Sequence, residues 1–307
     1  MERARDTPTH SLSHTHAPHC PLTLFFSPDM DAPFPPWRRA VTVAGSKLAW
    51  AVLTALGFTI RVTGWEHVAA ANASHPRCVA IFNHVSWADA PLVMYLLAAS
   101  GVSRASNAHI PLIGTCIRAF QNIYIDRDGG RGAGVTARIA ARVADPRWPM
   151  VILAPEGTCG DGRCMLRFRT GAFVPGAPVL PVLLSYENAR CNPAWTNHAS
   201  VAWHFVRCGT QVSKVLAVRV LAPYVPSAAE KADPALYATN VRALYARELG
   251  LPCVDQGYEE FAALTRAGVH VSWDGRAVVG PPGVVRSDGT VDLSGEGGGG
   301  RRAKKDE

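Results

Sequence analysis

The segment from Phe82 to Asp89, FNHVSWAD, contains a histidine and an aspartate that could work together in acid–base chemistry. His84 and Asp89 are five residues apart, so one continuous helix would place them on different faces. Ser86 and Asp89, however, have the spacing of a capping box, with Ser86 as the N-cap and the acidic side chain reaching back over the helix start, where His84 lies. We therefore expect Asp89 to fix the imidazole tautomer, so that the other ring nitrogen of His84 can accept a proton.

Three further segments follow the His–Asp pair in order along the chain. The pair alone has low specificity, because a turn histidine beside an ordinary helix cap has the same spacing. The additional segments are Gly114 through Ile123-Tyr124-Ile125-Asp126-Arg127, then Pro155-Glu156-Gly157-Thr158 directly after an apolar run, and then Leu180-Pro181-Val182. Four blocks in this order make chance agreement improbable, where one motif would not.

Together the blocks resemble the glycerophospholipid acyltransferase family, whose motifs N-H-x-x-x-x-D and P-E-G-T they match. Two details look most similar to the lysophosphatidylcholine and lysophosphatidylethanolamine acyltransferases of that family. Cys159 replaces the arginine that commonly follows P-E-G-T, and the segments FRTGAF (168–173) and NPAW (192–195) are similar to segments of that branch. The resemblance covers roughly residues 37–255, and we expect no EF-hand extension like that of some animal members.

This resemblance implies transfer of an acyl chain from acyl-CoA to the free hydroxyl of a lysophospholipid. His84 would take the hydroxyl proton as the oxygen attacks the thioester carbonyl, and Asp89 would stabilise the imidazolium without being protonated. Backbone N–H groups at the helix start near Ser86 would stabilise the oxyanion. Because a thioester is already activated, the resemblance requires no metal, no cofactor and no covalent acyl-enzyme, and acyl-CoA is the co-substrate.

The resemblance also assigns substrate contacts, to Arg127, Glu156, Gly157 and Thr158. The guanidinium of Arg127 offers a fork suited to phosphate, and the alternative is a surface arginine paired with a neighbouring aspartate. Glu156 would hold an arginine or accept a hydrogen bond from a glycerol hydroxyl, and the alternative is an ion pair at the strand end. Gly157 would allow close approach of the backbone to a ligand. The residues expected to support the motifs are Asn83, Ser86, Gly114, Pro155 and Pro181.

The cysteines show no metal or disulfide pattern. Cys159 and Cys164 are close in sequence, but no further ligand pair with standard spacing lies nearby, so we expect plain thiols that line a pocket. The eight cysteines are scattered and never spaced C-x-x-C, which favours reduced thiols in a cytosolic compartment over a secreted disulfide framework.

Three other functions compete with this interpretation. The first is acyl transfer to lysophosphatidic acid or glycerol 3-phosphate, which the missing arginine after Thr158 disfavours, because a phosphate monoester carries a second negative charge. The second is a hydrolase, but the chain has no G-x-S-x-G nucleophile elbow. The third is a non-catalytic membrane adaptor. Nucleic acid is not an expected partner, because the basic residues form no patch interleaved with aromatic side chains.

The elements that must position these residues alternate between strands and helices. Apolar runs of strand length alternate with segments of helical pattern, which predicts an α/β fold with a mostly parallel mixed sheet flanked by helices. The predicted strands are 78–82, 122–126, 150–154, 179–184, 201–206 and 215–221, and the predicted helices are 86–99, 132–144 and 234–249. Asp274-Gly275 between β-prone flanks predicts a hairpin over 270–279.

The expected domain organisation follows from shifts in composition. We expect a disordered leader at 1–36, a membrane-associated apolar segment at 37–64, an acyltransferase domain at 65–255, an extension with the hairpin at 256–285 and a flexible Gly-rich basic tail at 286–307. Within the second segment, the clean apolar run from Leu48 to Ile60 is shorter than the ~20 residues of a straight span. Arg38, Arg39 and Trp37 before it favour membrane contact over a plain core helix.

Composition and charge agree with a membrane-bound substrate. Of the 307 residues, 48% are hydrophobic, which excludes a wholly disordered chain, and the formal net charge is +7. Residues 1–20 are polar and His-rich, without the apolar core of a signal peptide. Lys304 and Lys305 resemble a dilysine retrieval signal, with a solubilising charged tip as the alternative. We therefore expect the endoplasmic reticulum membrane, with the catalytic domain and tail facing the cytosol, and membrane lipid as a partner.

Overall fold

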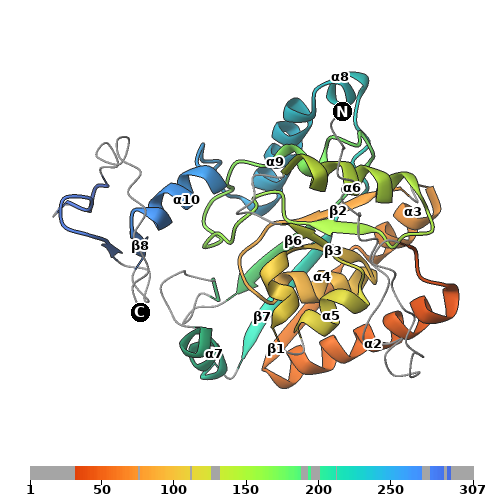
Figure 1. Cartoon of the computed structure of the whole chain (residues 1–307), viewed down its shortest axis with the longest axis horizontal. Coiled ribbons are helices and arrows are strands. Elements are labelled where there is room, and N and C mark those ends of the chain that lie inside the picture. Colours follow the sequence, from red (N-terminus) through yellow and green to blue (C-terminus); the bar gives the residue numbers. More distant parts are fainter. Residues whose placement is uncertain are drawn as a thin grey trace, which may run out of the picture.

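The computed structural model describes residues 32–74, 77–110, 113–125, 132–187, 193–194, 201–211, 213–271, 277–286 and 289–291. A seven-stranded sheet lies at its centre, with helices on both faces (Figure 1). The strands are β1 Phe58–Thr63, β2 Val79–Phe82, β3 Ser100–Arg104, β4 Ile123–Ile125, β5 Val151–Leu153, β6 Val179–Glu187 and β7 Lys214–Val220. Their order in the sheet is β1-β7-β6-β2-β5-β3-β4. Only β6 and β7 run antiparallel, so the predicted mostly parallel mixed α/β sheet is confirmed.

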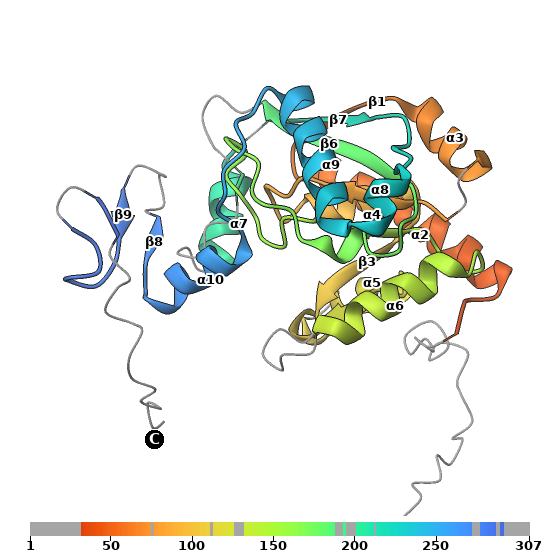
Figure 2. The ribbon, with the colours of Figure 1, turned by 90° about the horizontal axis from the view of Figure 1, so that it is seen from above.

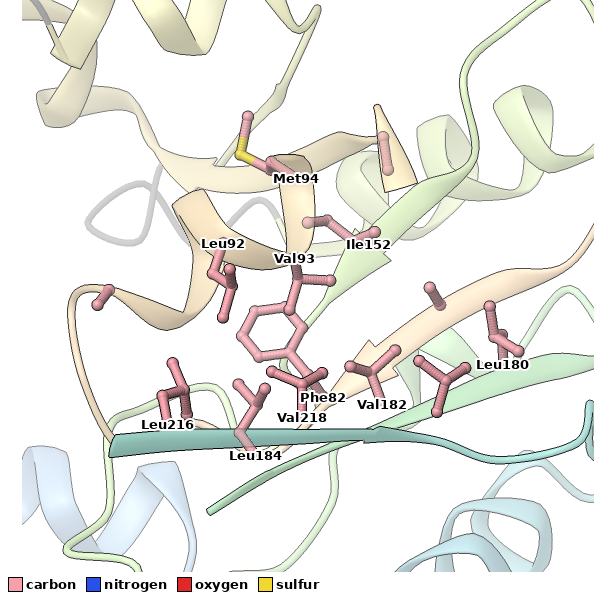
Figure 3. Packing of buried hydrophobic residues seen from close by; sticks show 14 of the residues in the cluster. Phe82, Leu92, Val93, Met94, Ile152, Leu180, Val182, Leu184, Leu216 and Val218 are labelled. Carbon is pink, nitrogen blue, oxygen red and sulfur yellow. The ribbon is translucent and has the colours of Figure 1, made fainter. Parts of the chain in front are cut away.

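Two hydrophobic clusters fix the helices to the two faces of the sheet. Helices α2 Pro36–Ala55 and α4 Asp89–Leu97 pack on one face, where Leu92 and Val93 contact the side chains of the central strands (Figure 3). Helices α6 Gly132–Ala144 and α9 Pro234–Leu249 cover the other face (Figure 2). The remaining helices are α3 Trp65–Ser74, α5 Ile113–Ala119, α7 Val201–Gly209, α8 Ala228–Ala232 and α10 Tyr258–Arg266, with the short turns η1 Ala105–His109 and η2 Thr170–Ala172.

Strong local signals set the elements that were predicted correctly. β2 is buried at every position, as a continuous apolar run in a parallel sheet with two covered faces should be. Helix α9 has the predicted bounds, because Asp233 accepts hydrogen bonds from Ala235 and Leu236 at its start and Gly250 ends it with a φ of +67°. Helix α6 also has the predicted bounds.

The predicted strand at 201–206 is wrong, because this segment is part of helix α7. Its β-branched and aromatic residues are typical of a strand, but the burial follows a helical period: His204 and Cys208, four residues apart, are buried, while Trp203 and Val206 are exposed. Over six residues the two periods are hard to separate. Strands β1 and β3, in contrast, were not among the predicted elements.

The predicted apolar segment 37–64 contains two different elements. Helix α2 ends at Ala55, and β1 begins at Phe58 and pairs with β7 along its whole length, so the run from Leu48 to Ile60 is divided between a helix and the sheet. In the part of the chain that the structure describes, no helix is both long and apolar enough to cross a bilayer. The leader up to residue 31 and the tail from residue 292 lie outside the described residues.

The C-terminal extension projects from one end of the sheet (Figures 1 and 2). After α10, strands β8 His270–Val271 and β9 Val278–Val279 pair antiparallel, with His270 opposite Val279. The predicted hairpin is thus confirmed, although its Asp274-Gly275 turn lies outside the described residues.

Candidate active site

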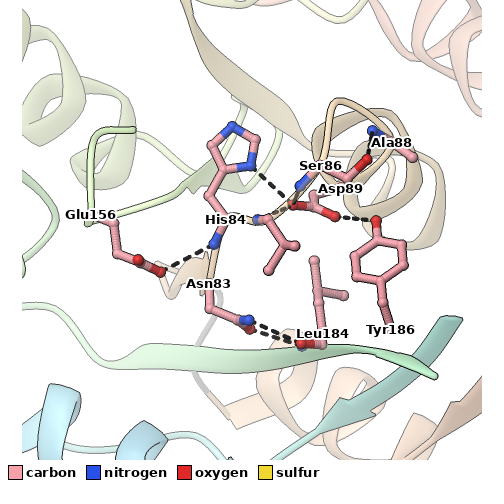
Figure 4. A network of polar contacts seen from close by, with 9 residues as sticks. Asn83, His84, Ser86, Ala88, Asp89, Glu156, Leu184 and Tyr186 are labelled. Atoms are coloured by element: carbon pink, nitrogen blue, oxygen red, sulfur yellow. Dashed lines mark hydrogen bonds and ion pairs between the residues drawn. The ribbon is translucent and has the colours of Figure 1, made fainter. Parts of the chain in front are cut away.

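His84 and Asp89 meet at the carboxyl end of β2, in the loop that leads into α4 (Figure 4). The distance between His84 Nδ1 and Asp89 Oδ2 is 3.0 Å. The Asp89 side chain is fully buried, whereas 23% of the His84 side chain is exposed. The predicted contact between the two side chains is therefore present, with the carboxylate inside the protein and the ring accessible from outside.

The backbone of the same loop holds the Asp89 carboxylate. Oδ2 accepts hydrogen bonds from the N–H groups of Val85, at 2.6 Å, and Ser86, at 2.7 Å. The carboxylate thus reaches back as predicted, but the helix begins at Asp89 with Ala88 as N-cap rather than Ser86. The Ser86 hydroxyl accepts from the Ala88 N–H instead of completing a capping box, which corrects the predicted helix start.

Tyr186 completes the surroundings of the carboxylate. Its hydroxyl, at the end of β6, donates a short hydrogen bond to Asp89 Oδ1 (Figure 4). Burial, followed by the charge of Asp89, raises the Tyr186 pKa well above its usual value, so the phenol stays a donor. No motif marked this residue. The only signal in the sequence is an aromatic side chain with a polar end after the apolar run of β6.

Asn83 and Tyr245 join the strands below the pair. The Asn83 side chain donates to the Leu184 carbonyl at 2.9 Å and accepts from the Leu184 N–H at 2.8 Å, so it fastens the end of β2 to β6. Pro181 of β6 lacks an N–H and cannot donate a hydrogen bond to a neighbouring strand. Close to it, the Tyr245 hydroxyl joins β2 to β6, because it donates to the Ile81 carbonyl and accepts from the Val182 N–H. Tyr245, from α9, is a second residue that the sequence did not reveal.

Glu156 supports the histidine from the opposite side. It follows β5, the other neighbour of β2, and its Oε1 accepts a hydrogen bond from the His84 N–H at 3.1 Å. The side chain is 2% exposed, and this burial raises the Glu156 pKa to about 7 despite the hydrogen bond from His84. Its observed partner is thus the His84 loop, and its predicted contact with substrate stays a prediction.

The rest of P-E-G-T shapes the loop. Gly157 has a φ of +72°, a backbone conformation that favours glycine, and a Cβ there would also lie 3.0 Å from Arg169 Cδ, so the arginine side chain would have to shift. The Pro155 carbonyl accepts the Arg169 N–H at 2.7 Å, and Thr158 is buried.

Cys159 interacts with the imidazole of His84. Its thiol is a side-chain partner of the His84 ring, and the following residue, Gly160, donates its N–H to the His84 carbonyl at 2.7 Å. Cys164 lies on the same loop and is partly exposed, as Cys159 is. Within the described residues, no three His, Cys, Asp or Glu side chains are arranged to hold a metal ion.

The partners of the imidazole set its protonation. Burial lowers the pKa of His84, but the electrostatic interaction with Cys159 and the hydrogen bond with Asp89 outweigh it and raise the pKa to about 10. Because Nδ1 faces Asp89, Nε2 is the nitrogen left to exchange a proton with a reactant. The arrangement has the parts of a general acid–base catalyst: a buried carboxylate, an oriented imidazole and an accessible ring edge.

Two predicted residues do not join this group. Gly114 is the second residue of α5 and lies where this helix packs against η1. A Cβ there would lie 2.1 Å from the Ala108 carbonyl oxygen, so glycine is required for packing. Arg127 lies outside the described residues, as do Asn192 and Trp195 of the NPAW segment. The strand before Arg127, β4, ends at the same edge of the sheet as β2 and β5, because all four strands from β2 to β4 in the sheet order run parallel.

Comparison with known proteins identifies the family of this chain. Residues 59–185 match the family described as Acyltransferase. The human protein named Lysophosphatidylcholine acyltransferase 2 is 33% identical over 243 residues, which are 77% of this chain and 43% of that protein. The Drosophila melanogaster protein named Lysophosphatidylcholine acyltransferase is 36% identical over 202 residues, 64% of this chain and 38% of that protein.

Among solved structures, the 1-acyl-sn-glycerophosphate (LPA) acyltransferase PlsC from Thermotoga maritima gives a TM-score of 0.49 at 19% identity, covering 75% of this chain and 86% of that one. The matched region spans less than half the length of the lysophosphatidylcholine acyltransferases named above. The family match includes the His84–Asp89 pair, the P-E-G-T loop and the first seven residues of β6. This chain belongs to the glycerophospholipid acyltransferase family, on its lysophosphatidylcholine acyltransferase branch.

Proposed function

We propose that this protein is an O-acyltransferase that moves an acyl chain from acyl-CoA to the free hydroxyl of a lysophospholipid of the lysophosphatidylcholine or lysophosphatidylethanolamine type. The observation that carries the proposal is the 3.0 Å contact between His84 Nδ1 and the buried Asp89 carboxylate, in a loop that the family match includes. This contact orients a general base at the carboxyl ends of parallel strands, where α/β proteins bind their ligands.

The reaction proceeds by direct attack. His84 Nε2 takes the proton from the acceptor hydroxyl as its oxygen attacks the thioester carbonyl, and Asp89 stabilises the imidazolium that forms. Collapse of the tetrahedral intermediate expels the CoA sulfur, which receives the proton from His84. The acceptor gains an ester and no cofactor takes part, because the thioester is activated before it binds. Arg127, Gly157 and Thr158 are proposed to contact the substrate.

The acceptor class rests on the relatives and on one residue. The relatives described above carry lysophosphatidylcholine in their names, and Cys159 stands where many family members have an arginine. One cation fewer near the acceptor favours a phosphodiester, with one negative charge, over the monoester of lysophosphatidic acid or glycerol 3-phosphate. Those two acceptors remain the alternative within the family.

The substrates also suggest where the protein works. Helix α2 and its C-cap residue present an exposed apolar face, formed by Trp37, Val41, Val52 and Leu56. The spacing of these residues places them on one side of the helix, and Arg38 lies at the border of this face. We propose that this face lies on the membrane interface, where apolar side chains enter the acyl region and arginines meet lipid phosphates. The dilysine-like Lys304 and Lys305 support the endoplasmic reticulum, with the catalytic domain facing the cytosol.

The test is CoA release from acyl-CoA with a panel of lysophospholipids in detergent micelles. We expect the protein to use lysophosphatidylcholine or lysophosphatidylethanolamine, and His84→Ala to lower kcat at least ~100-fold, the usual size of a general-base contribution. The control is His67→Ala, at a partly exposed histidine of α3.

Each contrary result has one meaning. Full activity of His84→Ala would contradict the mechanism. A clear preference for lysophosphatidic acid would replace the acceptor class, and absence of transfer to every acceptor by the unchanged protein would favour the non-catalytic adaptor.

A further inference from the structure

A second nucleophile lies within the candidate active site. Cys159 follows the P-E-G-T loop, and the chain from Cys159 to Gly162 runs along His84 and Val85. The Gly160 N–H donates to the His84 carbonyl at 2.7 Å, and a Cβ on Gly162 would contact Val85 at 3.4 Å. The backbone of this segment is therefore fixed against the histidine, and the Cys159 side chain interacts with the imidazole of His84.

Cys159, His84 and Asp89 have the arrangement of a cysteine nucleophile, its base and the carboxylate that orients the base. Asp89 is buried and holds Nδ1, the ring is partly exposed, and the thiol is partly exposed as well. Such an arrangement activates a thiol for attack on an acyl group. The general-base mechanism gives Cys159 no task, so its position calls for an explanation of its own.

We propose that Cys159 is itself an acyl acceptor, which takes the acyl chain from a thioester donor when no lysophospholipid occupies the site. This proposal rests on the proposed function only for the donor, acyl-CoA.

The step balances as a thioester exchange. The Cys159 Sγ attacks the carbonyl carbon and His84 receives the thiol proton. The bond between that carbon and the CoA sulfur breaks, and CoA leaves as a thiol with the proton from His84. One thioester replaces another, so the exchange is close to thermoneutral and excess CoA reverses it. No oxidant or reductant is needed.

Cys164 provides the matched comparison on the same loop. Burial, and then the negative charges of Asp161 and Glu156, raise the pKa of the Cys164 thiol. A smaller fraction of Cys164 is therefore present as the reactive thiolate. Cys116 and Cys253 are exposed and do not belong to the group formed by His84 and Asp89. Their alkylation rates therefore give the reactivity of ordinary surface thiols. The chain thus contains its own internal standards.

The main experiment is incubation of the full chain with acyl-CoA, without acceptor, followed by denaturation and peptide mass spectrometry. We expect close to one acyl group per chain, on Cys159, removable by neutral hydroxylamine as a thioester is. Cys159→Ala and His84→Ala should abolish the label, and Cys164→Ser should retain it. Adding lysophosphatidylcholine together with acyl-CoA should reduce the label, because the hydroxyl competes for the same carbonyl.

A second measurement does not depend on the donor. The rate of alkylation by iodoacetamide, mapped by the same peptides, should be at least tenfold higher at Cys159 than at Cys116 or Cys253, and His84→Ala should remove this advantage. Acyl-CoA should protect Cys159 from alkylation and leave Cys116 unaffected.

The outcomes separate this inference from the proposed function. Transfer to lysophospholipid with no label on Cys159, or label equal on Cys159 and Cys164, would overturn the inference and leave the proposed function intact. Fast, His84-dependent alkylation of Cys159 in a protein that transfers no acyl group would instead overturn the proposed function and retain an activated thiol. Ordinary alkylation rates at Cys159 would refute the activated thiol itself.

Discussion

At the scale of single residues, the Asp89 carboxylate is the most heavily coordinated group of the site. Oδ2 forms hydrogen bonds with the imidazole and with two backbone N–H groups, and Oδ1 accepts a hydrogen bond from the Tyr186 hydroxyl. A carboxylate with this many hydrogen-bond partners is fixed in position. The basicity of His84 therefore depends on groups that never touch a reactant.

Tyr186 is one such positioning residue, and Tyr186→Phe tests it. Removing the donor leaves Oδ1 with more negative charge for the imidazolium, so the His84 pKa should rise further and the acidic limb of the pH–kcat profile should move to higher pH. We expect kcat at neutral pH to fall about tenfold with little change in KM, and stability to fall by about 1–3 kcal/mol.

The control for this change is Tyr237→Phe. The Tyr237 hydroxyl donates to the Ala177 carbonyl at 3.0 Å in the other cluster, so its loss should lower stability and leave the pH profile in place. If Tyr186→Phe merely lowered stability in the same way, Tyr186 would have a structural role alone.

Cys159→Ala should move the pH profile in the opposite direction. A general base acts in its neutral form, so a pKa raised to about 10 places the rise in kcat at alkaline pH, above the range of an ordinary histidine. Cys159 contributes to that raised value, and its removal should lower the pKa and shift the acidic limb to lower pH. The measurement is kcat between pH 6 and 11, in steps, for both proteins.

Glu156 lies behind His84 and titrates near pH 7, so Glu156→Gln is needed as a second profile. If the acidic limb of the pH–kcat profile moved with Glu156→Gln and not with Cys159→Ala, the limb would report the titration of Glu156 instead of His84. That result would contradict this prediction.

The sequence predicts those site residues that are neighbours along the chain. His84 and Asp89 share one short loop, so local turn and capping rules suffice to bring them together. Tyr186 is 97 residues from Asp89, and their contact exists because β6 lies beside β2 in the sheet. Tyr245 is 164 residues from Ile81, and their contact exists because α9 packs on a face of the same sheet. Strand order is a tertiary property, and no local pattern encodes it.

At the scale of elements, termini with strong capping signals were predicted and short ambiguous runs were not. Helices α6 and α9 have their predicted bounds, whereas β1 was missed because its first three residues belong to the apolar run from Leu48 to Ile60, which was assigned to one segment. Helix α7 was mistaken for a strand because its first six residues include two valines and two aromatic residues, which are typical of strands, and so short a segment is compatible with both periods. Pairing with distant strands decides such cases.

Gly114 allows an element-scale test with a matched control. A Cβ at Gly114 would lie 2.1 Å from the Ala108 carbonyl oxygen, so Gly114→Ala must separate α5 from η1, and we expect a loss of about 1–3 kcal/mol in urea unfolding. At Gly134, in α6, a Cβ would meet nothing within 4 Å, so Gly134→Ala should stabilise by up to about 1 kcal/mol through helix propensity. Equal effects at the two sites would contradict the packing role of Gly114.

At the scale of the whole molecule, the exposed face of α2 should decide where the protein resides. We expect the protein to sediment with phosphatidylcholine vesicles that contain anionic lipid, and the binding to weaken with salt because Arg38 lies at the border of the face. Trp37→Ser combined with Val41→Asn should weaken partitioning by about tenfold or more, from the apolar area withdrawn from lipid.

Val225→Asn is the control for the vesicle assay, because Val225 is as exposed as Trp37 but lies outside α2. If both variants lost vesicle binding equally, general surface hydrophobicity would account for the partitioning. If neither lost it, the face would have no part in binding.

The position of β7 between β1 and β6 has a consequence for biosynthesis. β1 is the first strand to leave the ribosome, yet its neighbour in the sheet begins at Lys214, so β1 must wait while about 150 residues are made before it can pair. Residues 59–185, the region that matches the family, end before β7 and so lack the strand that links β1 to the rest. A fragment with those limits should aggregate through its unpaired strand edges, whereas coexpression with a second fragment that contains β7 should rescue it.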